Sequence, residues 1–194
     1  LSDLIPVTKY DLKVRAVNKD GASAWTDYSV TTKSDPLEFA IRGIRGECSA
    51  ETQWGKGIAR LFDLNESGEM WHTKYQVRAV PFNVVMDLRT VNQLDKFQYL
   101  PRIDGVNGML LKGKVEYSMD KKTWTDAGTF EWKRNADMKE FKFEGAPEAR
   151  YIRLSVTEGV GYYGSGREIY VFRKPGTEGY LQGDINADGK IDHN

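Results

Sequence analysis

The chain has 194 residues, of which 40% are hydrophobic and 29% charged, a composition typical of a globular protein with its own core. Its 28 basic residues balance 28 acidic ones, so no broad electrostatic field favours nucleic acid or an anionic membrane as a partner. No apolar run is long enough for a membrane span. A single cysteine, Cys48, excludes an intrachain disulfide, and with only His72 and His193 the chain lacks the ligands for a cysteine–histidine zinc site.

Residues 9–17 alternate apolar and polar side chains, which predicts a half-buried strand, and a turn at 18–21 leads into a second run through Trp25 and Val30. Two strands bury too little surface to be stable alone. Residues 1–35 resemble the C-terminal hairpin of a fibronectin type III domain. The resemblance is carried by Leu4, Pro6, Thr8, Tyr10, residues 14–18, Gly21, Ser23, Trp25 and residues 31–32. It implies that Tyr10 forms a tyrosine corner, that most of that sandwich lies upstream of residue 1, and that the hairpin is a spacer.

A boundary is expected at residues 34–36, where Pro36 restricts the preceding residue to an extended conformation. From there to residue 174 we find strand-like stretches and no convincing amphipathic helix. The clearest stretches are residues 83–88, 95–100, 113–118, 140–144, 151–156 and 168–172. This pattern predicts an all-β domain, a β-sandwich or jelly roll, over residues 36–174. Trp71 and Trp124 are expected in its core, and Cys48 is expected to be a small buried apolar residue.

The central domain resembles the discoidin, or coagulation-factor type C, domain, and especially its bacterial carbohydrate-binding modules, which share the galactose-binding-like fold. The segments that carry the resemblance are residues 48–52, 61–73, 84–88, 99–102, 104–108, 115–124, 149–154 and 165–172. Two features depart from the family pattern. Lys121 stands where glycine is usual, in a turn where a positive φ is costly for other residues, and the loop between Asp63 and Trp71 is longer.

The same resemblance implies a structural calcium ion between the early loop and the last strand. Asp63, Asn65 and Ser67 would supply oxygens from the loop, and Glu168 a carboxylate from the far end of the chain. In the alternative interpretation, Asp63 and Asn65 merely form an Asx-turn.

Sugar binding requires flat aromatic faces for the apolar side of a pyranose and a few polar groups that recognise its hydroxyls. The candidates in predicted loops are Trp54, His72, Arg102, Asp104, Asn107, Tyr162 and Tyr163. Each has a structural alternative: His72 as a hydrogen-bonded structural histidine, Arg102 as a brace for its own loop, and Asp104 and Asn107 as turn residues.

Residues 175–194 are expected to be a linker followed by the truncated start of a dockerin-like EF loop, which in a complete dockerin would bind a cohesin. The expected ligands are Asp184, Asn186, Asp188, Lys190 and Asp192, at loop positions 1, 3, 5, 7 and 9. The sequence ends at position 11, before the carboxylate expected at position 12, so weak or no calcium binding is predicted here.

These observations predict a non-catalytic carbohydrate-binding module of a larger secreted or cell-surface bacterial glycoside hydrolase. Its expected ligands are glycans with terminal galactose, N-acetylgalactosamine or N-acetylglucosamine, without nucleic-acid binding or membrane insertion. A spacer or protein-contact module without sugar binding is the main alternative. A glycoside hydrolase with paired carboxylates, which no residue pattern marks, and a phospholipid-binding discoidin domain are two others.

Overall fold

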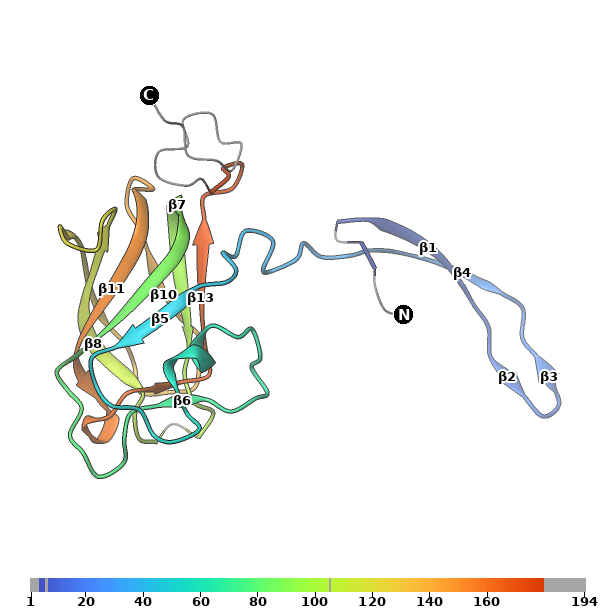
Figure 1. Cartoon of the computed structure of the whole chain (residues 1–194). Helices are drawn as coiled ribbons and strands as arrows, with labels where there is room; N and C mark the ends of the chain where they lie inside the picture. The colour runs from blue at the N-terminus through green and yellow to red at the C-terminus, as the bar shows by residue number, and fades with distance from the viewer. Residues whose placement is uncertain (1–3, 6, 105, 180–194) are drawn as a thin grey trace. The chain divides into compact units, whose positions relative to one another are not determined.

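The computed structural model describes residues 4–5, 7–104 and 106–179, and the chain divides into two compact units, Leu1–Glu38 and Phe39–Asn194 (Figure 1). Within the described residues no helix is long and apolar enough to cross a membrane. The all-β prediction is confirmed, because the regular structure of the part of the chain described here consists of strands and two short 3-10 turns.

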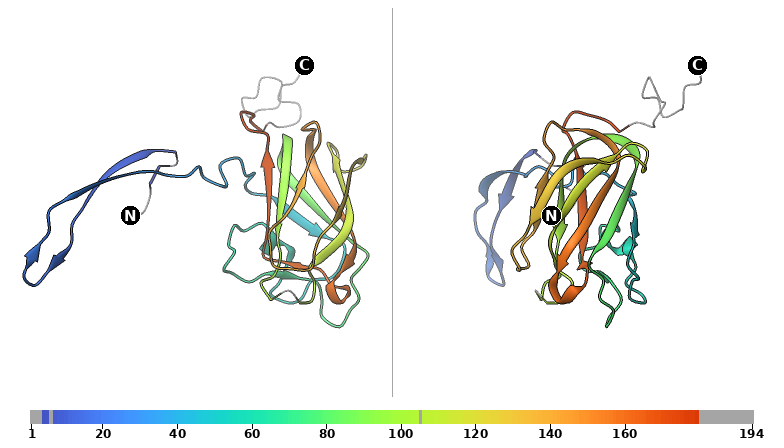
Figure 2. Two further views of the ribbon diagram at one scale, coloured as in Figure 1. Left: turned by 180° about the vertical axis from the view of Figure 1, so that it is seen from behind. Right: turned by 90° about the vertical axis from the view of Figure 1, so that its left-hand side faces the viewer.

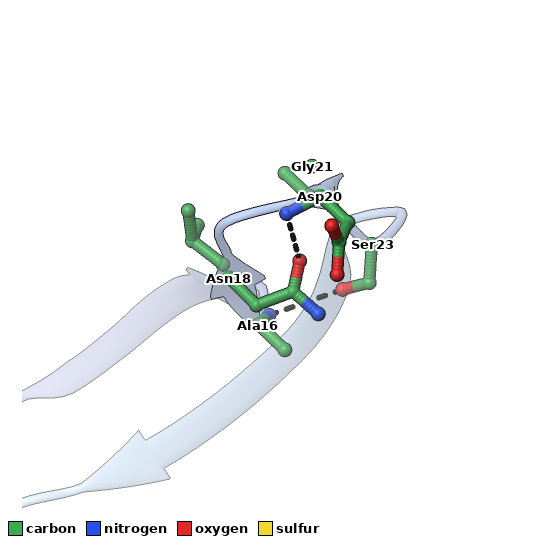
Figure 3. A pocket seen from close by; sticks show the side chains of 7 residues that line it. Ala16, Asn18, Asp20, Gly21 and Ser23 are labelled. Carbon is green, nitrogen blue, oxygen red and sulfur yellow. Dashed lines mark hydrogen bonds between the residues drawn. The ribbon is translucent and has the colours of Figure 1, made fainter.

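The first unit is a β-hairpin. Strands β1 (Lys9–Val14) and β4 (Thr26–Thr31) pair antiparallel, and β2 (Val17–Asn18) and β3 (Gly21–Ala22) pair near the tip. The residues that line the hollow at the tip bond one another: the N–H of Asp20 donates to Asn18 Oδ1, and that of Ala16 donates to Ser23 Oγ (Figure 3).

Near the start of the hairpin, the hydroxyl of Tyr10 accepts a hydrogen bond from the backbone N–H of Ile5, at 2.8 Å. A tyrosine corner makes a bond of this kind to backbone a few residues upstream. The fibronectin type III assignment itself stays a prediction.

The second unit is a sandwich of two antiparallel sheets that share one strand (Figures 1 and 2). The larger sheet has the order β5–β7–β11–β8–β9, and the smaller one has the order β10–β7–β13. The bounds are β5 (Arg45–Cys48), β7 (Phe82–Leu100), β8 (Leu110–Ser118), β9 (Thr125–Glu131), β10 (Lys139–Lys142), β11 (Glu148–Gly159) and β13 (Glu168–Arg173). A further short sheet pairs β6 (Trp71–His72) with β12 (Ser165–Gly166), and the two 3-10 turns are η1 (Ile58–Leu61) and η2 (Val160–Tyr162).

Strand β7 is a single strand of 19 residues where the sequence predicted two, at 83–88 and 95–100. Its first half pairs with β5 and β11, and its second half pairs with β10 and β13. The strand changes sheets near Arg89, whose φ of 72° breaks the regular extended conformation. The segment between the predicted strands is therefore a bend within one strand, which no glycine or proline marks in the sequence.

The core lies between the two sheets and is formed by the inward side chains of alternating strand positions. The larger sheet contributes Val84, Met86, Val115, Ile152, Leu154 and Val156, and the smaller contributes Phe97, Tyr99, Ile169 and Val171; Phe143, directly after β10, packs against them. Trp71 is fully buried, as predicted. The prediction for Trp124 is wrong in part: it is only half-buried, because its ring stacks under the Arg153 guanidinium, whose Cζ lies 4.2 Å from the ring centre. Cys48 is half-buried against the core, and burial raises the pKa of its thiol.

Lys121 adopts a φ of 63°, the left-handed conformation expected from the glycine usual at that turn. Lys121→Gly is therefore expected to have a higher free energy of unfolding than Lys121→Ala, by about 1 kcal/mol. Both variants lose the contact between Lys121 Nζ and Glu47. The difference between their free energies of unfolding therefore measures the cost of a positive φ in a residue other than glycine. Urea denaturation of the two variants measures it.

The neighbouring Lys122 is the control, because its φ is not positive. There, glycine is expected to be no more stable than alanine. An equal difference at both positions would contradict the backbone explanation.

Candidate functional site

The candidate site lies at one end of the sandwich, where four loops meet around β6 (Figure 1). Backbone bonds join the loops. On one side of β6, Gln53 N–H donates to the carbonyl of His72 at 2.9 Å; on the other, Thr73 N–H donates to that of Gly164 at 2.8 Å. The 101–108 loop is joined to the 159–166 loop, because Gly108 N–H donates to the carbonyl of Val160 at 2.7 Å. Side chains on this end are therefore held by a rigid backbone.

His72 lies buried at the centre of this end. Its ring packs against Tyr75, at 4.5 Å between centroids, and lies 5.7 Å from that of Tyr163. Nδ1 lies 2.5 Å from the carbonyl oxygen of Thr73; since a carbonyl only accepts, Nδ1 carries the proton. Burial, with smaller effects of nearby cations, lowers the pKa of His72, so the ring is neutral near pH 7. This geometry matches the structural-histidine alternative.

The Arg102 guanidinium forms hydrogen bonds within its own loop. Its Nε and Nη2 donate to the carboxylate of Asp104 at 2.5 and 2.7 Å, and its Nη1 donates to the carbonyl of Asn107 at 2.8 Å. This ion pair holds the pKa of Asp104 below its usual value. The Arg102 side chain is only 14% exposed, so the geometry matches the alternative in which Arg102 braces its loop.

The side chain of Asn107 lies against the neighbouring loop. A Cβ added to Gly161 would come within 2.7 Å of Asn107 Oδ1, and Gly161 has a φ of 69°. Glycine at 161 thus permits this close approach and the turn conformation. Asn107 and the ring of Tyr163 flank Gly161 and are thereby brought together.

The predicted aromatic residues differ in exposure. Trp54 is 94% exposed and borders a shallow concavity with Glu51, Gln53 and Lys74. Tyr162 is 55% exposed, whereas Tyr163 is half-buried and accepts a hydrogen bond from the N–H of Gln76 through its hydroxyl, at 3.1 Å.

Two residues of this end were not predicted. Tyr75 packs on His72, and the Cζ of Arg78 lies 4.0 Å from the ring centre of Tyr162. Both belong to the segment 73–80, which follows Trp71 and His72 directly and has no strand alternation. Its position after that motif was the available signal.

The predicted calcium loop meets β13 at Glu168. The N–H of Asn65 donates both to Asp63 Oδ1, at 3.0 Å, and to Glu168 Oε2, at 3.1 Å. The first bond is the Asx-turn of the alternative interpretation. The Asn65 amide lies against Gly68, and Ser67 is exposed. Nearby, the Tyr170 hydroxyl donates to Glu66.

Glu168 is fully buried, and desolvation raises the pKa of its carboxyl to about 8, with a further contribution from the negative charge of Asp63. A cation would relieve both effects. Among the described residues no group of three or more His, Cys, Asp or Glu side chains is arranged around a metal position. The donors at hand are two carboxylates with amide and backbone oxygens, a set that suits calcium. The predicted ligands of the tail, Asp184 to Asp192, lie outside the described residues.

Arg102→Lys is expected to lower the free energy of unfolding by about 1–2 kcal/mol, because lysine cannot make the three bonds that join Asp104 and Asn107. Chemical denaturation measures the change. Arg45→Lys, on the exposed side of β5, is the matched control and is expected to change stability by less than about 0.5 kcal/mol. Equal stability of the two variants would show that Arg102 does not brace the loop.

Comparisons with known proteins assign the fold. Two modules from Clostridium perfringens match. CpGH89CBM32-5, solved in complex with GalNAc-β-1,3-galactose, is 28% identical with a TM-score of 0.63, and the match covers 69% of this chain and 99% of that one. The family 32 CBM of NanJ, solved in complex with galactose, is 22% identical with a TM-score of 0.63, and the match covers 70% of this chain and 98% of that one. The C-terminal domain of a chitobiase from Bacteroides fragilis matches at 23% identity and a TM-score of 0.60 over 69% of this chain and 95% of that one. The family model of the F5/8 type C domain matches residues 46–169. The chain therefore belongs to the F5/8 type C domain family.

Proposed function

We propose that the central domain is a non-catalytic carbohydrate-binding module whose sugar site is the loop end around β6. The observation that carries this most directly is the exposure of Trp54, a large flat ring that is 94% accessible on a loop bonded to the backbone of His72. Exposed indole faces of this kind suit the apolar face of a pyranose. The 28% identical module CpGH89CBM32-5, which binds GalNAc-β-1,3-galactose, supports the assignment.

The remaining predicted residues divide by their role in this proposal. Trp54, Tyr162 and Asn107 are exposed residues and are proposed to contact sugar. Arg102 and His72 are proposed to hold the loops in place, because the Arg102 guanidinium binds Asp104 and the carbonyl of Asn107, and His72 Nδ1 binds the carbonyl of Thr73. Rigid loops reduce the entropy lost on binding, which matters for a small ligand that buries few atoms.

The ligand class is proposed to be glycans with terminal galactose, N-acetylgalactosamine or N-acetylglucosamine. The parent protein is proposed to be a secreted or cell-surface bacterial glycoside hydrolase, in which the module would raise the local concentration of the catalytic domain at its glycan. In the same proposal the hairpin of residues 1–35 is a spacer. A cohesin partner for the dockerin-like tail rests on the sequence pattern of residues 183–194 alone.

We also propose a structural calcium ion held by Asp63, Glu168 and neighbouring amide and carbonyl oxygens. Bound there, calcium would balance the negative charge of the buried Glu168 carboxylate and would join the early loop to β13.

Trp54→Ala is expected to weaken binding of GalNAc-β-1,3-galactose by at least about tenfold, because the stacking surface is lost. Isothermal titration calorimetry measures the affinity. Trp25→Ala is the matched control: Trp25 is 56% exposed but lies in the hairpin, so the affinity is expected to stay unchanged.

Two results would contradict the proposal. If Trp54→Ala and Tyr162→Ala both bind like the wild type, the site lies elsewhere. If the folded protein binds no member of a glycan array, the spacer or protein-contact interpretation replaces the sugar-binding one.

Adding calcium is expected to raise the free energy of unfolding, by about 2.7 kcal/mol when free calcium is about one hundred times its dissociation constant. Chelation reverses the gain, and thermal unfolding measures it. Glu168→Gln is expected to abolish the calcium dependence.

Two variants identify the responsible site. Asp184→Asn, in the tail, and Glu144→Gln, on the surface, are expected to keep the full calcium dependence. A dependence that disappears with Asp184→Asn and persists in Glu168→Gln would place the ion in the tail instead.

A further inference from the structure

A second concave surface lies beside Tyr162 on the loop end, separate from the concavity that Trp54 borders. It has a volume of about 530 Å³, and its lining includes Arg78, Arg134, Gly159, Gly161 and Tyr162. We call it the Arg78 site. Neither Arg78 nor Arg134 belongs to the residues proposed above to contact sugar.

Arg78 is held in place without being neutralised. Its guanidinium stacks on the exposed ring of Tyr162, with Cζ 4.0 Å from the ring centre. Among residues 4–5, 7–104 and 106–179, no acceptor or carboxylate binds this guanidinium. Stacking on a ring face leaves the N–H donors at the guanidinium edge free for a ligand. The contrast is Arg102, whose bonds to Asp104 and Asn107 occupy the nitrogens that would bind one.

The stacked pair stands on a fixed backbone. Ala79 and Val80 both donate their N–H groups to the carbonyl of Tyr162, at 2.9 and 3.2 Å. Tyr162 itself has a φ of 68°, a conformation unfavourable for a non-glycine residue. Such strain persists where the surroundings over-determine it, and it concentrates at ligand-binding sites. The two bonds therefore keep Tyr162, and with it Arg78, in a defined position.

The charge of the site is positive. Arg134 adds a second guanidinium to the lining. The lining carboxylate, Glu158, faces Lys112, whose Nζ lies 3.8 Å away and also contacts Glu131. Glu158 is thus compensated by a cation outside the site, and the Arg78 guanidinium is left to attract an anion.

We propose that the Arg78 site binds an anionic substituent of a glycan, either a carboxylate or a sulfate ester, and that the module therefore prefers acidic glycans. The planar fork of a guanidinium matches the two oxygens of either group in a bidentate arrangement. Tyr162 contributes a face for the attached sugar ring. This inference rests on the proposed sugar-binding function and specifies the ligand class for that same loop end.

The test uses three sugars that differ only in the group at carbon 6: galactose, galacturonic acid and galactose 6-sulfate. Their affinities for the full chain are measured by NMR titration at low ionic strength. The wild type is expected to bind at least one acidic sugar about five- to tenfold more tightly than galactose. The acidic sugar that binds more tightly than galactose identifies the anion as carboxylate or sulfate.

Arg78→Gln is expected to reduce the ratio of acidic to neutral affinity to about one, and Arg78→Lys to retain part of it, since lysine keeps the charge and loses the fork. Arg42→Gln is the matched control. Arg42 is exposed near the bridge between Ala40 and Phe172, at the far end of β13 from Glu168, and its substitution is expected to keep the full ratio. Thermal unfolding confirms that each variant is folded.

The outcomes distinguish failure of the Arg78 site from failure of the proposed carbohydrate-binding function. Galactose binding without a gain for either acidic sugar overturns the Arg78 site and leaves the module function intact. A gain that survives in Arg78→Gln also overturns it, because another group then binds the anion. If none of the three sugars binds and no glycan array signal is found, the site and the proposed function fail together.

Discussion

The continuity of β7 is the constraint on which the rest of the structure depends. One strand forms the middle of the larger sheet in its first half and the middle of the smaller sheet in its second. The two sheets are therefore fixed relative to each other by covalent structure as well as by packing. Because β7 ends at Leu100, opposite Glu168 at the start of β13, the 101–108 loop and the 159–166 loop leave the sandwich side by side. The candidate site is built on this convergence.

At the loop end, backbone hydrogen bonds replace the contacts that a sheet would provide. The ring of His72 is buried and neutral, and it contacts the rings of Tyr75 and Tyr163. It therefore supports these two side chains. The exposed aromatic residues are displayed on this support. Trp54 and Tyr162 present their rings from different loops, and each borders its own concavity.

Three charged side chains around this end are in three different electrostatic states. Glu168 is buried with a second carboxylate near it, so the pKa of its carboxyl is raised. Arg102 is neutralised by Asp104 and holds a loop. Arg78 is positioned by an aromatic ring and faces outward without an acceptor in the described part of the chain. Two arginines thus serve as a brace and as an anion-binding candidate, and one glutamate serves as a metal-ligand candidate, according to their surroundings.

The sequence by itself determined the all-β class, most strand positions and the buried Trp71, because alternation and apolar runs report which face of a strand is buried. The resemblance to the discoidin pattern, in which glycine is usual at this turn, also indicated the positive φ at Lys121. Only the tertiary structure decided that 83–88 and 95–100 are one strand, that His72 is buried and that Arg102 binds Asp104 and the carbonyl of Asn107. The pairing of Arg78 with Tyr162 is likewise a product of the fold, because the two residues lie in loops far apart in the sequence. Local pattern says what a residue is suited to do, and long-range packing decides which groups it meets.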